Sequence, residues 1–172
     1  MIIDGRAMAR EILERTKVRA EALGKAPRVS AIVVSESAAT KSYLGIKAAR
    51  AMDAGCILEV VRLPAATSMT VLLDVVSSAD TDAVIVQLPL PNGMDEKEVC
   101  NAIEISKDAD VLSAASRAAF EHSSDALLPP VVAAVKKILD SQSVEIVGKK
   151  AVVIGAGFLV GAPVATWLEE QG

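Results

Sequence analysis

Aromatic residues and cysteines are scarce in this sequence. Its 172 residues include one Trp, one Tyr and two Phe, so a core would be built mainly from aliphatic side chains. The two cysteines, Cys56 and Cys100, lie far apart in apolar segments. We expect free thiols in a reducing compartment rather than a disulfide. No metal site is expected, because His122 is the sole source of an imidazole.

Long apolar runs and clusters of positive charge are also missing. No stretch reaches the roughly 18 consecutive apolar residues that a membrane-spanning helix needs. The first residues show no basic segment followed by a long apolar run, as a secretory signal would. The net charge is −4 and no run of Lys or Arg occurs, which argues against a nucleic-acid or membrane partner. We therefore expect a cytoplasmic protein.

Hydrophobic residues make up 52% of the chain, enough to bury a substantial core. Short runs rich in β-branched residues alternate with segments of helical periodicity. We predict strands at residues 1–3, 29–34, 57–61 and 83–88, and helices at 5–23, 40–54, 69–78 and after a cap at Asp95. This strand–helix order, with short connections, predicts an α/β fold with a parallel sheet.

The periodic pattern weakens between residues 113 and 124, and we place a domain boundary there. Residues 1–120 are assigned to an amino-terminal catalytic α/β domain. Residues 121–172 are expected to contain a helix through about residue 140, a strand at 151–154, a glycine-rich turn and a helix at 162–171. That order predicts the beginning of a Rossmann-type dinucleotide-binding domain.

The glycine-rich turn contains Gly155, Gly157 and Gly161. Glycines between a strand and a helix let the backbone approach a phosphate closely, and the amino end of the helix favours an anion. A plain tight strand–helix turn would account for the same glycines.

Gln87 interrupts the apolar run near the carboxyl end of the strand predicted at residues 83–88, and two prolines follow at positions 89 and 91. Ligands of open parallel sheets bind beyond the carboxyl ends of the strands, so Gln87 lies where a site is expected. Tyr43 and Lys47 are four residues apart on a predicted helix and project from one face. The alternative is ordinary structure: a hydrogen-bonded strand-end glutamine, a half-buried tyrosine and an exposed lysine.

Asp110 follows Lys107-Asp108-Ala109 and precedes two apolar residues. It could lie at the edge of buried structure and accept hydrogen bonds from the N–H groups of a ligand. The alternative is a solvated loop.

Together these segments resemble the bifunctional methylenetetrahydrofolate dehydrogenase/methenyltetrahydrofolate cyclohydrolase family. The matching motifs occur in the family's order and cover the whole chain. They are Asp4-Gly5-Arg6, Ser42-Tyr43-x-x-x-Lys47, Val86-Gln87-Leu88-Pro89-Leu90-Pro91, Lys107-Asp108-x-Asp110, Gly148-Lys149-x-Ala151-Val152-Val153-Ile154-Gly155 and Val160-Gly161-x-Pro163.

The resemblance implies two α/β domains that flank a folate cleft. Lys47 would be the central catalytic group, Gln87 would hydrogen-bond it and set its protonation, Tyr43 would pack against the folate, and Asp110 would hold the pterin ring. Leu88 and Pro89 would complete the substrate contacts. NADP or NAD would bind at residues Gly155, Ala156, Gly157, Val160 and Gly161, without a metal. A homodimer is expected.

The expected chemistry is hydride transfer from 5,10-methylenetetrahydrofolate to the nicotinamide, followed by hydrolysis of the methenyl product to 10-formyltetrahydrofolate. The methenyl bridge is an amidinium cation, so the attacking water must lose a proton and the leaving nitrogen must gain one. A cation beside Lys47 would favour the neutral amine by like-charge repulsion, which suits the residue to acid–base work.

Four departures from the family pattern stand out. The family's Gly-Arg-Ser turn is Gly155-Ala156-Gly157 here, which removes the obvious partners of a 2′-phosphate and argues against a preference for NADP. The family's Asp-Gly-Phe is Asp110-Val111-Leu112, and its Pro-Cys-Thr-Pro is Leu127-Leu128-Pro129-Pro130. Most of the Rossmann domain and the returning carboxyl-terminal helix are missing, so the chain is either a truncated enzyme or a short diverged relative.

Two further functions stay open at this point. The altered phosphate turn, the altered loop at Asp110 and the missing domain would suit a non-catalytic relative that binds folate or a partner chain. An amino-acid-dehydrogenase-like enzyme has a similar two-domain layout, although the Gln-Leu-Pro-Leu-Pro segment argues against it.

Overall fold

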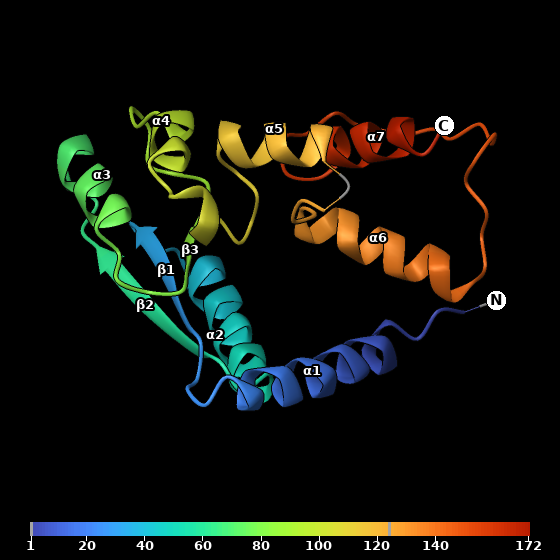
Figure 1. The fold of residues 1–172 in the computed structure, drawn as a ribbon. Coiled ribbons are helices and arrows are strands. Elements are labelled where there is room, and N and C mark those ends of the chain that lie inside the picture. Colours follow the sequence, from blue (N-terminus) through green and yellow to red (C-terminus); the bar gives the residue numbers. More distant parts are fainter. Residues whose placement is uncertain (1, 124) are drawn as a thin grey trace. The chain divides into compact units, whose positions relative to one another are not determined.

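The computed structural model describes residues 2–123 and 125–172 and divides the chain into two compact units. The division lies between Asp108 and Ala109, earlier than the boundary expected at residue 120. The first unit contains the sheet, and the second is helical (Figure 1).

The first unit alternates helices and strands in the expected order. Its elements are α1 (Gly5–Ala22), β1 (Arg28–Val34), α2 (Ala38–Asp53), β2 (Ile57–Leu63), α3 (Met69–Ser77), β3 (Ala83–Val86), α4 (Glu96–Asn101) and the 3-10 turn η1 (Ile105–Lys107). The three strands form a parallel sheet in the order β2-β1-β3, which confirms the predicted α/β fold.

Strand β1 lies in the middle of the sheet and contributes to apolar clusters on both faces. Ile32 and Val34 belong to a cluster that includes Leu72 of α3 and Val99 of α4. The intervening residues, such as Val33, belong to a second cluster with Leu44 of α2. With both faces of this central strand covered, its residues Ala31–Val34 are all apolar and buried, as the sequence indicated.

Polar side chains fix the helix starts next to these strands. Ser37 accepts a hydrogen bond from the N–H of Thr40 and caps α2, and Asp95 caps α4. Asp4 caps α1 as expected, but α1 is exposed over most of its length. Only Ala20 of its apolar positions is buried, and the side chain of Ile12 is 44% exposed.

The strand predicted at residues 1–3 is wrong for the part that the structure describes. Ile2 and Ile3 form no strand and are exposed, while Met1 lies outside the described residues. Three residues offer too few ladder hydrogen bonds to hold an edge strand without further packing.

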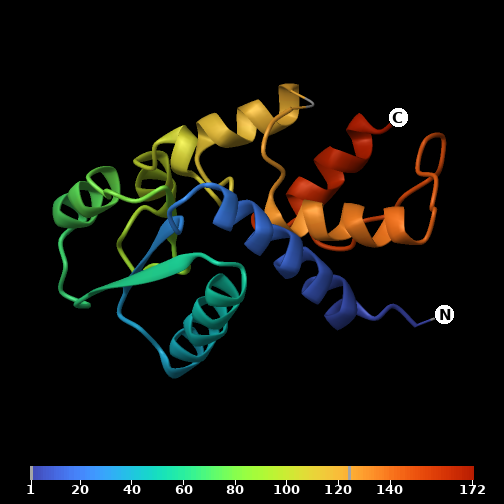
Figure 2. The ribbon, with the colours of Figure 1, turned by 60° about the horizontal axis from the view of Figure 1, so that its bottom comes forward.

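The second unit contains α5 (Ala114–His122), α6 (Pro130–Ser141) and α7 (Gly161–Glu170). Its core brings together Val111, Phe120 of α5, Val132 of α6 and Trp167 of α7. Helix α7 packs beside α6, as both views of the ribbon show (Figure 2). No helix of the described ranges is long and apolar enough to cross a membrane.

Two features of the second unit differ from the sequence-based expectation. Helix α5 was not predicted, because its small and polar residues show no apolar period, although Ser113 caps it. The strand expected at residues 151–154 does not form. A strand needs a partner for its backbone groups, and no described segment pairs with it; Val152 and Ile154 are 86% and 97% exposed.

Candidate active site

Tyr43 and Lys47 lie one helical turn apart on α2 and are brought together as expected. The Lys47 Nζ lies 5.0 Å from the centroid of the Tyr43 ring, within the range of a cation–π contact. Lys47 is half-buried, whereas 51% of Tyr43 is exposed. The ring therefore holds the ammonium on one side and still presents surface on which a flat ligand could pack.

Gln87 follows β3 at the carboxyl edge of the sheet. Its backbone N–H donates to the carbonyl of Ile32 at 2.8 Å, which fixes it beside the central strand. Its side-chain Nε2 donates to the carbonyl of Leu88 at 2.9 Å, but no described group donates to its buried Oε1. A buried amide oxygen without a donor is rare and costly, so it marks a place where a ligand N–H could bond.

The hydrogen bond expected between Lys47 and Gln87 is not formed, because the Oε1 atom has no donor. The Gln87 amide nitrogen is turned to the next carbonyl of its own chain, and the Lys47 ammonium lies over the Tyr43 ring.

The loop after Gln87 is held to α4. The N–H of Leu90 donates to the Glu96 Oε1 at 2.9 Å. Leu88 is half-buried and Pro89 is exposed, and the peptide bond between them is cis. Of the two predicted substrate contacts, Pro89 is thus the one that faces solvent most fully.

The Lys107-Asp108 pair is not part of a solvated loop. Lys107 Nζ donates to the carbonyl of Ala79 at 2.9 Å, and Asp108 is only 2% exposed. Asp108 pairs with Val84 of β3 in a parallel bridge. The end of the first unit is therefore tied to β3, the strand that Gln87 follows.

Asp110 is half-buried at the start of the second unit, directly before Val111. Val111 has a left-handed backbone with φ 54° and is 1% exposed. This conformation is rare for a β-branched residue and favours glycine. Burial of the Val111 side chain in the second core keeps the residue there.

The glycine-rich turn is exposed at residues 155–160 and ends at the buried Gly161. A Cβ on Gly161 would lie 1.8 Å from the carbonyl oxygen of Gly155, so only glycine fits. The N–H of Ala162 already donates to the carbonyl of Gly157 at 3.1 Å, and Pro163 has no N–H. The turn is tight, as predicted, but α7 offers few backbone donors to an anion.

Arg117 of α5 contacts this turn, although no pattern in the sequence pointed to this residue. Its Nη2 donates to the carbonyl of Phe158 at 2.9 Å, and its Cζ lies 3.8 Å from the centroid of the Phe158 ring. The stretch around Arg117 has no period or motif that would have singled it out.

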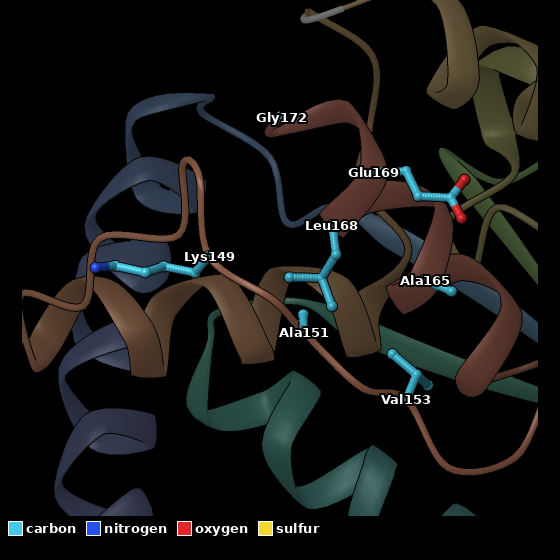
Figure 3. A pocket seen from close by; sticks show the side chains of 7 residues that line it. All are labelled: Lys149, Ala151, Val153, Ala165, Leu168, Glu169 and Gly172. Carbon is cyan, nitrogen blue, oxygen red and sulfur yellow. The ribbon is translucent and has the colours of Figure 1, made fainter.

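A pocket of about 380 Å³ lies elsewhere in the second unit and contains none of the glycine-turn residues (Figure 3). It forms where the extended segment before the turn runs beside α7. Its lining residues are Lys149, Ala151, Val153, Ala165, Leu168, Glu169 and Gly172. Within the described ranges, no group of three His, Cys, Asp or Glu side chains is placed to hold a metal ion.

The clearest pKa shifts occur at the amino end of the sheet. Arg28 forms a two-fold bond to Glu59, with distances of 2.7 and 3.1 Å. This bond lowers the pKa of Glu59 and raises that of Arg28. The Arg28 backbone N–H, followed by the Lys25 ammonium, lowers the pKa of Asp82. This cluster joins the strands at the end of the sheet away from Gln87.

The family model of the tetrahydrofolate dehydrogenase/cyclohydrolase catalytic domain matches residues 3–110, including Tyr43, Lys47, Gln87 and Asp110. The chain belongs to this family. The match covers the first unit from residue 3 onward and ends at Asp110, the last residue of the Lys-Asp-x-Asp motif.

Known members of the family resemble the chain along its whole length. The mitochondrial bifunctional methylenetetrahydrofolate dehydrogenase/cyclohydrolase of Drosophila melanogaster is 31% identical over 99% of this chain and 58% of that protein. The bifunctional protein FolD of Moorella thermoacetica is 34% identical over 97% and 62%, respectively. The chain thus spans about three fifths of the length of these relatives.

A solved structure shows the same fold. The Trypanosoma brucei N5,N10-methylenetetrahydrofolate dehydrogenase-cyclohydrolase, complexed with NADP cofactor and an inhibitor, superposes with a TM-score of 0.91. It is 30% identical and covers 99% of this chain, which covers 61% of that one. Cys56 and Cys100 form no disulfide, as expected from their separation in the sequence.

Proposed function

We propose that this chain carries the catalytic residues of a bifunctional methylenetetrahydrofolate dehydrogenase/cyclohydrolase in one-carbon metabolism. The observation that carries the proposal is the Lys47 ammonium held over the Tyr43 ring, in a unit that matches the family's catalytic domain. The unpartnered Gln87 Oε1 supports it, because it leaves an acceptor at the edge of the sheet where substrates of parallel α/β proteins bind.

In the proposed cyclohydrolase step, water attacks the amidinium carbon of the methenyl bridge. Lys47 takes up a proton from the water and delivers one to the leaving ring nitrogen. The cationic substrate favours the neutral amine of Lys47 until the bridge opens. The exposed face of Tyr43 packs against the pterin, and Gln87 Oε1 accepts a hydrogen bond from Lys47 or from the ligand.

Asp110 is proposed to hold the pterin ring through hydrogen bonds to its N–H groups. Lys107 and Asp108 support this role, because they anchor the preceding segment to the carbonyl of Ala79 and to β3. In this proposal residues 1–120 contribute the folate-binding part and residues 121–172 the first part of a dinucleotide-binding domain.

In the proposed dehydrogenase step, NADP or NAD accepts a hydride from 5,10-methylenetetrahydrofolate when it is bound. Gly155, Ala156, Gly157, Val160 and Gly161 would hold its phosphate end. The tight backbone approach at Gly161 fits such a turn, since the space that a side chain would fill is closed by the Gly155 carbonyl.

We also propose a cytoplasmic homodimer. Two cysteines that form no disulfide are typical of a reducing compartment. The exposed Val152 and Ile154 favour association, because contiguous apolar surface is costly in water.

The test is turnover of 5,10-methenyltetrahydrofolate by the wild-type chain, Lys47→Ala and the matched control Lys41→Ala. Lys41 is exposed on the same helix and outside the site. We expect Lys47→Ala to lower the rate by at least about a hundredfold, the range of acid–base catalysis, and Lys41→Ala to keep it. Equal rates for all three proteins would reject Lys47 as the catalytic group. Folate binding without turnover in the wild type would show a non-catalytic relative.

A further inference from the structure

The glycine-rich turn carries no positive charge of its own. Residues 155–172 include no Lys or Arg, and Glu169 and Glu170 are the charged side chains of that stretch. A dinucleotide brings several negative charges to its phosphate end. The backbone compensates little, because the Ala162 N–H already has the Gly157 carbonyl as its partner and Pro163 has no N–H. A bound nucleotide would therefore need a cation from another element.

Arg117 brings a cation to this turn from α5. The guanidinium Cζ lies 3.8 Å from the centroid of the Phe158 ring, and Nη2 donates to the carbonyl of the same residue. These two contacts, one to the ring and one to the backbone of Phe158, together hold the guanidinium at the turn. Arginine suits this task, since its planar group stacks on aromatic rings and keeps its charge throughout the physiological pH range.

The stack also accounts for the aromatic residue in the turn. Phe158 is one of only two phenylalanines and is 43% exposed, an unfavourable place for an apolar ring. A guanidinium over its face gives the ring a partner without enclosing it. Arg117 is half-buried, so its charge is less screened than that of a side chain extended into water.

We propose that Arg117 is the specificity-determining residue for the phosphate end of the dinucleotide, with Phe158 as the residue that positions it. The proposal rests on the dehydrogenase half of the proposed function. Arg117 attracts the anion by charge, while the Phe158 contact keeps that charge beside the exposed backbone of residues 155–160. The 2′-phosphate of NADP carries more charge than the 2′-hydroxyl of NAD. NADP therefore depends on Arg117 more strongly than NAD, although Ala156 and Gly157 themselves offer it no side chain.

The experiment measures the dissociation constants of NADP and NAD by titration calorimetry at two salt concentrations. The proteins are the wild-type chain, Arg117→Met, Arg117→Lys, Phe158→Leu and the control Lys150→Met. Lys150 is exposed, and the control removes the same unit of charge away from the turn. Circular dichroism and retained NAD binding show that each variant is folded.

We expect Arg117→Met to raise the dissociation constant of NADP at least tenfold and that of NAD about threefold or less. The dissociation constant of NADP should also depend less on the salt concentration. Arg117→Lys, which keeps the charge but loses the planar stack, should lie between Arg117→Met and the wild type. Phe158→Leu should also raise the dissociation constant of NADP, and Lys150→Met should change neither constant. An unchanged ratio of the two constants in Arg117→Met, or an equal change in Lys150→Met, would overturn the proposal.

Two outcomes separate this proposal from the proposed function. A wild-type chain that hydrolyses methenyltetrahydrofolate but binds neither nucleotide overturns the role of Arg117 and leaves the cyclohydrolase function standing. A chain that binds NADP in an Arg117-dependent way, with Lys47→Ala as active as the wild type, supports Arg117 and rejects the catalytic role of Lys47.

Discussion

The two polar atoms of the Gln87 side chain differ in their hydrogen bonding. Its Nε2 holds the adjacent Leu88 carbonyl, whereas its buried Oε1 has no donor among the described residues. The folded protein bears the desolvation cost of that oxygen, of the order of 1–3 kcal/mol, without a bond in return. Such a cost is typical of a position kept for binding or catalysis.

Gln87→Met tests the effect of these atoms on activity and on stability, because methionine keeps the length of the side chain and removes both polar atoms. Turnover of methenyltetrahydrofolate should fall by about a hundredfold. The free energy of unfolding should change by less than about 1.5 kcal/mol, since the lost bond to Leu88 and the lost desolvation cost oppose one another. Steady-state kinetics and urea denaturation measure the two effects. The matched control is Gln142→Met at the end of α6; a Gln87→Met protein with full activity would contradict the assignment.

Gly161 has a steric role that its neighbour Gly157 lacks. In Gly161→Ala the new methyl would lie 1.8 Å from the Gly155 oxygen, whereas nothing lies within 4 Å of the corresponding position at Gly157. We expect Gly161→Ala to lower the free energy of unfolding of the second unit by about 1–3 kcal/mol or more. Gly157→Ala should change it by less than about 1 kcal/mol. Thermal unfolding followed by Trp167 fluorescence compares the two, and equal stabilities would show that the turn relaxes freely.

At the scale of elements, the sequence predicted those parts whose pattern is local. The residues Ala31–Val34 of strand β1 are all apolar because both faces of the strand are covered. Ser37 and Asp95 mark helix starts through their own hydrogen bonds. Helix α5 escaped prediction because only Ser116 and Phe120 of it are buried, so it shows no apolar stripe. Residues 151–154 have a strand sequence, but a strand exists only through its partners.

The candidate site likewise has a part that the sequence could predict and a part that it could not. Tyr43 and Lys47 could be paired from their spacing, because an α-helix fixes which residues share a face. The missing bond between Lys47 and Gln87 could not be predicted, since it depends on the rotamers of both side chains. Arg117 could not be found either, because its contact with Phe158 joins residues 41 positions apart through the packing of α5.

Acid conditions should weaken the interactions of the Glu59 and Asp82 carboxylates at the amino end of the sheet. The folded-state pKa values of Glu59 and Asp82 lie below their ordinary values of 4.5 and 3.8. Their contribution to stability is therefore complete above those values and is lost as the pH falls through the folded pKa values. We expect Glu59→Gln to reduce the loss of stability between about pH 5 and pH 3. Urea denaturation at several pH values measures this slope, with Glu170→Gln as control; identical slopes for Glu59→Gln and wild type would contradict it.

At the scale of the whole molecule, the chain covers about three fifths of its relatives, such as 58% of the Drosophila protein. Its first unit has a closed core on both faces of a sheet, as the buried clusters on either side of β1 show. The second unit has a core of its own between three helices but leaves the backbone of residues 151–154 unpaired. The two units therefore differ in how much apolar surface they leave to be covered by something else.

Substitutions of Val152 and Ile154 can test whether another molecule covers the exposed segment at residues 151–154. Each is almost fully exposed, at 86% and 97%, so replacing either with lysine removes no internal contact. The unfolding free energy of the isolated chain at low concentration should change by less than about 0.5 kcal/mol in Val152→Lys. If the proposed homodimer covers this segment, the same variant should shift the chain from dimer to monomer in sedimentation equilibrium, because two lysines would face apolar surface across the contact.

Val153→Lys is the counterpart, since Val153 is only 36% exposed and lines the pocket beside α7, so it should lower stability as well. A wild-type chain that stays monomeric at high concentration would exclude the dimer, and a Val152→Lys variant that dimerises like the wild type would place the contact elsewhere.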